Sequence, residues 1–74
     1  MLVYSDDLEL DINDFSDVRI IDTDEDWAEV YLRNKLMGHC EIFTDKENQN
    51  REYICINYTI CYLDEFQNYS KINN

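Results

Sequence analysis

The stretch that decides the fold is residues 51–63, with the sequence REYICINYTICYL. Two short runs rich in β-branched and aromatic residues, 53–56 and 59–63, flank Asn57 and Tyr58. Such runs favour strands, and a polar pair between them suits the tight turn of a β-hairpin. The stretch therefore predicts two antiparallel strands joined at Asn57 and Tyr58.

The neighbouring segments also read as short strands. Residues 39–44 and 51–56 flank the polar run 45–50, which predicts a second hairpin. Residues 18–21 are mostly β-branched and follow a run of turn-forming residues. The chain has no proline and one glycine, Gly38, which predicts a bend or bulge in a strand. We expect a mainly β protein, built as a small, strongly curved antiparallel sheet or barrel.

The segment that begins at Thr23 favours a short helix near residues 23–29. Thr23 could cap the helix, with Asp26 three residues later, and acidic residues suit the positive end of a helix dipole. The continuation is ambiguous between helix and strand over 28–36. We favour a strand at 28–33, because the sequence after it reads as β; the alternative is an α+β fold with a helix at 23–36.

Acidic residues are concentrated near the start of the chain. Eleven of the 17 Asp and Glu residues lie in the first 29 positions, where Arg19 is the single base. That stretch carries about ten net negative charges, and residues 30–74 carry about one. Such a field repels nucleic acid and anionic lipid and attracts proteins with a basic cleft. We expect no direct binding of nucleic acid or of a membrane.

Residues 7–12 alternate between acidic and apolar side chains. This period of two predicts a half-buried strand with Asp7, Glu9 and Asp11 on its outer face. Side chains on one face of a strand repeat about every 6.7 Å. The outer face would therefore be a regular row of carboxylates.

Length and composition indicate one small domain. We expect it to cover residues 1–72, with 73–74 as a frayed tail. The chain is 45% hydrophobic and 14% aromatic, too apolar for a disordered protein despite a formal charge of −11. It lacks an apolar run of about 20 residues and the pattern of a signal peptide, so we expect a soluble protein in the cytoplasm of a bacterial host. Three cysteines without a CxxC motif indicate reduced thiols.

Catalytic and metal-binding patterns are weak. His39 and Cys40 are adjacent, so in a strand their side chains point to opposite faces and form no dyad. The run of alternating aspartates at 22–26 starts like a calcium loop, but Trp27 stands where the loop needs glycine and Arg33 where it needs glutamate. We therefore expect no enzyme, no cofactor and no metal site.

A pattern of short segments covers about half of the chain. Its members are Val30-Tyr31-Leu32-Arg33-Asn34, Gly38, Ile42-Phe43-Thr44-Asp45, Asn48, Tyr53-Ile54-Cys55-Ile56 and Ile60-Cys61-Tyr62-Leu63-Asp64-Glu65-Phe66. These segments resemble the Sm-like family of small SH3-type barrels, in which a bending glycine, an aromatic-Asp pair and an RNA-contacting Asn recur. The resemblance implies a barrel, with Asn48 at the RNA-contacting position. However, Asn57 and Tyr58 replace the family's Arg-Gly, and the strong negative charge opposes RNA binding.

In size, charge and composition the chain resembles the small acidic DNA mimics encoded by phages and mobile elements, which include anti-CRISPR and anti-restriction inhibitors. The resemblance implies that acidic side chains occupy the basic groove of a nucleic-acid-binding protein such as a nuclease. The predicted contact residues are Asp7, Glu9, Asp11, Asp22, Asp24, Glu25, Asp26, Glu29 and Trp27, with Phe15 and Tyr31 as further aromatic anchors. The alternative is a self-associating Sm-like barrel that acts as a scaffold or regulator, paired through an edge strand at 59–63.

Overall fold

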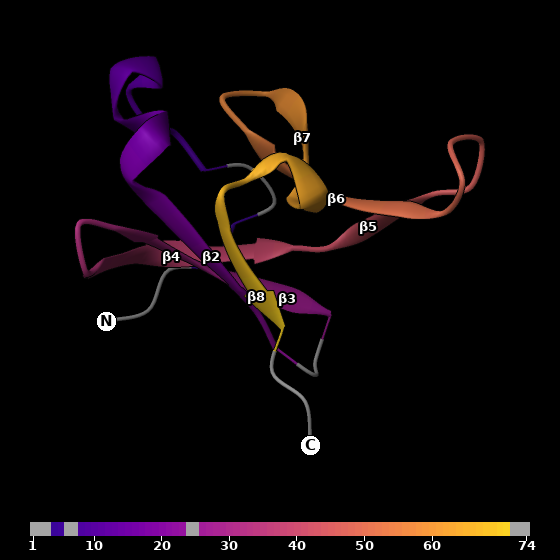
Figure 1. Cartoon of the computed structure of the whole chain (residues 1–74), viewed down its shortest axis with the longest axis horizontal. Coiled ribbons are helices and arrows are strands. Elements are labelled where there is room, and N and C mark those ends of the chain that lie inside the picture. Colours follow the sequence, from indigo (N-terminus) through magenta and orange to yellow (C-terminus); the bar gives the residue numbers. More distant parts are fainter. Residues whose placement is uncertain (1–3, 6–7, 24–25, 72–74) are drawn as a thin grey trace.

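The computed structural model describes residues 4–5, 8–23 and 26–71. Strands and two short 3-10 helices make up the fold (Figure 1). In chain order the elements are β1 (Tyr4–Ser5), η1 (Ile12–Asp17), β2 (Val18–Asp22), β3 (Trp27–Leu32), β4 (Lys35–Glu41), β5 (Phe43–Asp45), β6 (Arg51–Ile56), β7 (Thr59–Tyr62), η2 (Leu63–Glu65) and β8 (Asn68–Lys71). The prediction of a mainly β protein is confirmed.

The strands form two sheets that share one core. The larger sheet has the order β1-β4-β3-β2-β8, and the smaller has the order β5-β6-β7. Strands joined by short turns pair antiparallel, as predicted. β1 pairs with β4 in parallel, and β8 pairs with β2 in parallel, because long connections separate the members of these pairs. Over the described residues the two sheets stay open at their edges, and no closed barrel forms.

The core lies between the inner faces of the two sheets. Alternate residues of β2, β3 and β4 point inward and meet residues of β6 and η2. The buried hydrophobic residues are Leu10, Val18, Ile20, Ala28, Val30, Cys40, Ile54, Ile56 and Leu63. The core therefore draws on residues from position 10 to position 63.

Two hairpins, β3–β4 and β6–β7, close through two-residue turns with a left-handed backbone. Asn57 and Tyr58 have φ values of 55° and 57°, and Arg33 and Asn34 have values of 48° and 67°. Two consecutive positive φ values define the turn type whose twist matches that of paired strands. The turn predicted at Asn57 and Tyr58 is confirmed, and so is the hairpin around 45–50, which the structure forms from β5 and β6.

Gly38 lies at an irregularity in β4, as predicted. Val30 pairs with Gly38 and the next residue, Tyr31, pairs with Leu36, so Met37 is an extra residue in the ladder. Gly38 itself is buried. A bulge of this kind increases the local twist of the strand.

The predicted helix near 23–29 is wrong, and so is the alternative helix at 23–36. β3 begins at Trp27 and pairs with β2 and β4, which confirms the strand expected at 28–33 within a residue. The hydroxyl of Thr23 donates to the Trp27 carbonyl oxygen at 2.7 Å, and the Thr23 N–H donates to the same oxygen at 3.0 Å. Thr23 therefore closes the connection between two strands, where we had expected a helix cap.

The predicted strand at 7–12 is also wrong. Leu8 makes only an isolated parallel bridge with Ile56, and η1 begins at Ile12, whose side chain is 76% exposed. Asp11 caps η1, because its Oδ1 accepts the Asn13 N–H at 2.9 Å. This local side-chain bond competes with strand pairing. The prediction for Asp7, and the fraying predicted for 73–74, lie outside the described residues.

Candidate functional site

The structure separates the predicted contact residues into three groups. Glu9, Asp11 and Asp26 are exposed, whereas Trp27 and Glu29 are half-buried on β3. Asp22 is buried. The remaining three, Asp7, Asp24 and Glu25, lie outside the described residues. The acids that we predicted as one surface are thus distributed over different parts of the fold.

Asp22 does not belong to an exposed contact surface. Its side chain is 4% exposed and lies on the inner face of β2. The Tyr69 hydroxyl donates to its Oδ2 at 3.0 Å, and the Lys71 ammonium lies 3.8 Å from the same atom. Burial, with added effects of Asp22, raises the pKa of Tyr69 to about 12. Asp22 therefore fastens β8 to β2, because a buried carboxylate needs hydrogen bonds and an opposite charge.

Glu29 belongs to a network on the outer face of the larger sheet. Its Oε2 lies 3.4 Å from Nε2 of His39, and the Tyr31 hydroxyl donates to its Oε1 at 3.3 Å. The Arg19 guanidinium lies 4.7 Å from the centre of the Tyr31 ring. Burial raises the pKa of Tyr31, and the Glu29 carboxylate raises it further. Glu29 and Tyr31 are thus engaged with their neighbours in the sheet.

Glu9 and Asp11 are positioned by Asn57. The Leu10 N–H donates to Oδ1 of Asn57 at 2.8 Å, and Nδ2 of Asn57 donates to the Leu10 carbonyl oxygen at 2.6 Å. The backbone N–H of Asn57 also donates to the Leu8 carbonyl oxygen at 2.8 Å. These bonds clamp residues 8–10 against the β6–β7 turn. Leu10 enters the core, so its two acidic neighbours point to solvent.

A hollow of about 420 Å³ lies between the clamped segment and the turn. Glu9, Leu10, Asp11, Asn57 and Tyr58 line it, and the side chain of Tyr58 is 83% exposed. None of the ion pairs recorded among the described residues includes Glu9 or Asp11. Two carboxylates beside an exposed aromatic ring are suited to a guanidinium or ammonium group.

Two further acids continue this surface along η1. Asp14 and Asp17 both accept from Nη1 of Arg33, at 3.1 and 3.2 Å. In a 3-10 helix, side chains three residues apart lie above one another, so Asp14 and Asp17 lie on one side of η1, and Asp11 stands before them at its N-cap. We call Glu9, Asp11, Asp14 and Asp17 the acidic ridge. We did not include Asp14 and Asp17 in the predicted site, although their spacing of three residues was visible in the sequence.

Most of the basic side chains are already engaged by acids or rings. Besides the contacts of Arg33, Arg19 and Lys71, Arg51 donates to Asp64 at 2.6 and 2.9 Å and to Glu65 at 3.2 Å. Its guanidinium also lies 3.9 Å from the centre of the Tyr62 ring. These bonds raise the pKa of Arg51, and hydrogen bonding to Arg51 lowers the pKa of Asp64. Few bases remain to offset the acidic ridge.

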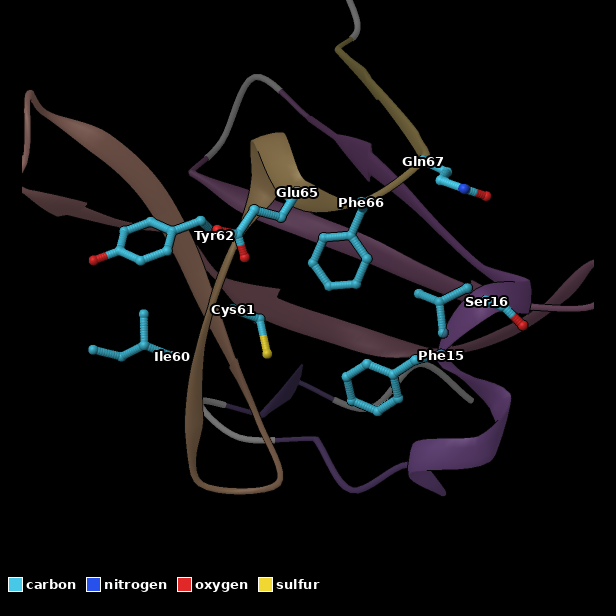
Figure 2. Close-up of a pocket in the computed structure, with 9 residues that line it drawn as sticks. Phe15, Ser16, Ile60, Cys61, Tyr62, Glu65, Phe66 and Gln67 are labelled. Atoms are coloured by element: carbon cyan, nitrogen blue, oxygen red, sulfur yellow. The ribbon is translucent and has the colours of Figure 1, made fainter.

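An apolar groove of about 450 Å³ lies next to the acidic ridge. Figure 2 shows the Phe15 and Phe66 rings on one side of the groove and β7 on the other, with the sulfur of Cys61 pointing in. Its lining residues are Phe15, Ser16, Val18, Ile60, Cys61, Tyr62, Glu65, Phe66 and Gln67. Of these, Phe15 was predicted as an aromatic anchor, and Ile60, Cys61 and Tyr62 lie in the strand at 59–63 that the alternative predicts as a pairing edge. Phe66 carried no separate signal, because apolar residues in strand-like runs usually enter the core.

Comparison of the chain with protein-family models, with curated proteins and with solved structures found no match. Within the described residues, no helix is long and apolar enough to cross a membrane. The same residues contain no group of three or more His, Cys, Asp and Glu side chains that is placed to hold a metal ion.

Proposed function

We propose that this protein is an acidic inhibitor of the kind encoded by phages and mobile elements. It occupies the basic groove of a host nucleic-acid-binding defence protein, such as a CRISPR nuclease, in the bacterial cytoplasm. The acidic ridge carries this proposal, because Glu9 and Asp11 are exposed, take part in no recorded ion pair and lie beside the exposed ring of Tyr58. Inhibition would follow from occupancy alone, without catalysis.

The geometry of η1 supports the imitation of a phosphate row. A 3-10 helix rises about 2 Å per residue, so acids three positions apart repeat about every 6 Å. Successive phosphates of one DNA strand are about 3.4 Å apart along the helix axis. Because the strand also winds around the axis, successive phosphates are about twice this far apart in space, so the spacing of the ridge is close to that of successive phosphates. Its attraction to a basic groove should weaken with added salt, because exposed charges are screened.

A self-associating scaffold or regulator is the second candidate, although the described strands form two open sheets and not the closed barrel that the Sm-like resemblance implies. The observation in its favour is that β7 is an edge of its sheet, with Ile60 at 50% exposure. An exposed edge of this kind could pair with another copy. Against it stands the formal charge of −11, since two copies would repel one another.

The test is capture from a bacterial lysate on the immobilised protein, followed by elution with salt or with duplex DNA. We expect a nucleic-acid-binding protein that both eluents release. Glu9→Lys should abolish its retention, whereas Glu47→Lys should not. Both positions are exposed and undergo the same charge change, but Glu47 lies in the 46–50 turn, at the opposite end of the molecule from η1 (Figure 1). Equal effects of the two variants, or retention that ignores salt and DNA, would refute the proposal.

A second pair of variants changes the ridge in the opposite direction. Arg33→Gln removes the guanidinium that bonds Asp14 and Asp17, so the captured protein should bind more tightly and elute at higher salt. Lys46→Gln removes the same charge from the 46–50 turn and should leave elution nearly unchanged. If both variants shift elution by the same amount, net charge and not the ridge determines binding. Sedimentation of the unmodified protein alone tests the second candidate, which predicts that copies of the protein associate with one another.

A further inference from the structure

Among the strands that the structure describes, β7 is an edge without a second partner, and the register of its hairpin determines which of its N–H groups point to that edge. Ile56 and Thr59 are the pair that closes the two-residue turn of the β6–β7 hairpin. In such a hairpin the closing pair exchanges both hydrogen bonds, and hydrogen-bonded pairs then alternate along the ladder. The amides of Thr59 and Cys61 therefore face β6. Those of Ile60 and Tyr62 face the open edge.

The open edge borders the apolar groove. The Phe15 and Phe66 rings lie across the groove from β7 (Figure 2), and Val18 also lines it. The volume of about 450 Å³ is within the range of sites that hold ligands in other proteins, about 300–1,000 Å³. An extended chain laid along β7 would therefore meet backbone groups on one side and apolar side chains on the other.

β7 lacks the features that usually protect an edge strand. Soluble proteins place lysine, proline or a bulge on such edges, or cover them with another element. The sequence of β7 is Thr-Ile-Cys-Tyr, with neither a charge nor a proline, and its pairing with β6 is regular. An edge of this kind is suited to accept an added strand from another chain, a common mode of peptide recognition.

Charge complementarity selects the occupant. Glu65, which also accepts from Arg51, lines the groove. Asp17, which accepts from Arg33, follows Ser16 at its other side, so the complementarity rests mainly on the net charge of the protein. With a formal charge of −11, the protein repels a second copy and attracts a basic chain. We propose that the groove binds an extended segment of alternating apolar and basic residues, which belongs to the partner protein and pairs with β7 as an added strand. This inference rests on the proposed function, since the segment would come from the same basic partner.

The test uses labelled eight-residue peptides and fluorescence anisotropy with the full chain. A peptide of alternating lysine and valine should bind. Peptides of alternating glutamate and valine, or lysine and serine, should bind at least about tenfold more weakly, because they lack the charge or the apolar side chains. Ile60→Pro should also lower the affinity for the lysine–valine peptide by at least about tenfold. Proline removes the N–H that faces the open edge, and the N–H groups that bond β6 remain. Ile60→Thr keeps that N–H and should lose less than about threefold.

A measurement on the unmodified protein covers the case in which Ile60→Pro fails to fold. The lysine–valine peptide should slow alkylation of Cys61, whose sulfur points into the groove. It should not slow alkylation of Cys55, which lies on the opposite face of the smaller sheet from the buried Ile54. Equal protection of the two thiols, equal binding of the valine and serine peptides, or binding that Ile60→Pro leaves unchanged would overturn the inference.

The peptide and lysate experiments fail separately. If the lysine–valine peptide protects Cys61 but the lysate yields no nucleic-acid-binding protein, the groove stands as a peptide site and the proposed function is wrong. If capture depends on Glu9 and no peptide binds, the proposed function stands and the groove inference is wrong. If the protein associates with itself, Ile60→Pro abolishes that association and no peptide binds, then the chain that pairs with β7 is a second copy of this protein.

Discussion

Replacement of Asn57 should destabilise the protein more than any other single change in a turn that the structure describes. Asn57 spans the β6–β7 turn and the segment that carries Glu9 and Asp11, through two side-chain bonds to the backbone of Leu10. It also has a φ of 55°, which asparagine tolerates better than most residues. Asn57→Ala loses both bonds and also the polar side chain that lets asparagine tolerate the left-handed backbone.

The expected loss in the free energy of unfolding has two parts, one from the hydrogen bonds and one from the backbone conformation. Two hydrogen bonds contribute about 1 kcal/mol each, so their loss costs about 2 kcal/mol. The left-handed backbone adds about 1 kcal/mol for alanine and little for glycine. Asn57→Ala should thus lower the free energy of unfolding by about 3 kcal/mol, and Asn57→Gly by about 2 kcal/mol. For a domain of this size the melting temperature should fall by about 12–24 °C and about 8–16 °C, respectively.

Thermal and urea unfolding followed by circular dichroism would measure both losses. Asn57→Asp provides a further check, because its carboxylate still accepts from the Leu10 N–H but faces the Leu10 carbonyl oxygen without a donor. Its stability should recover as the pH falls, when the protonated carboxyl group can donate. A loss of less than about 4 °C for Asn57→Ala would refute the clamp. Equal losses for alanine and glycine would refute the contribution of the backbone conformation.

Three further predictions concern the core and two pKa shifts. Ile54→Ala, in the core, should cost about 2–5 kcal/mol in urea unfolding, whereas Ile60→Ala, at the exposed edge, should cost less than about 1 kcal/mol. Burial raises the pKa of Tyr69 from 10.0 to about 12, so between these two values the folded state keeps a proton that the unfolded state loses. The free energy of unfolding should therefore fall as the pH rises through this window, and it should fall less in Tyr69→Phe. Arg51 lowers the pKa of Asp64, so their bond stabilises the fold at neutral pH and is lost as the pH falls through the lowered pKa. Arg51→Gln should therefore destabilise the protein at neutral pH and have little effect once the pH is below that lowered pKa.

Matched variants separate these effects from general changes. Tyr58→Phe removes a phenol from an exposed turn and should leave the alkaline part of the stability curve unchanged. Lys46→Gln removes a positive charge from an exposed turn and should not reproduce the acid dependence of Arg51→Gln. Loss of alkaline sensitivity in Tyr58→Phe, or equal curves for the two charge variants, would contradict the assigned pKa shifts.

Local turn chemistry explains which parts of the fold were predictable. The hairpins around 45–50 and at Asn57 and Tyr58 depend on residues next to one another, and so does the bulge beside Gly38. The alternation at 7–12 was misleading, because the cap by Asp11 competes with strand pairing and turns the chain into η1. The helix expected after Thr23 failed for a related reason. Thr23 bonds to Trp27 across a strand connection, and pairing with two neighbouring strands outweighs helix propensity in β3.

The sequence by itself determined the β character, the local turns and the excess of acidic residues, because these depend on composition and on neighbours along the chain. Only the tertiary structure decided what each acid does. Asp22 became buried because β8, about 47 residues later, pairs in parallel with β2 and brings the Tyr69 hydroxyl to it. Glu9 and Asp11 became exposed partners of Tyr58 because Asn57 clamps the backbone between them. Contacts between residues so distant in the chain leave no periodic signal, so the ridge and the groove emerge only when the sheets pack.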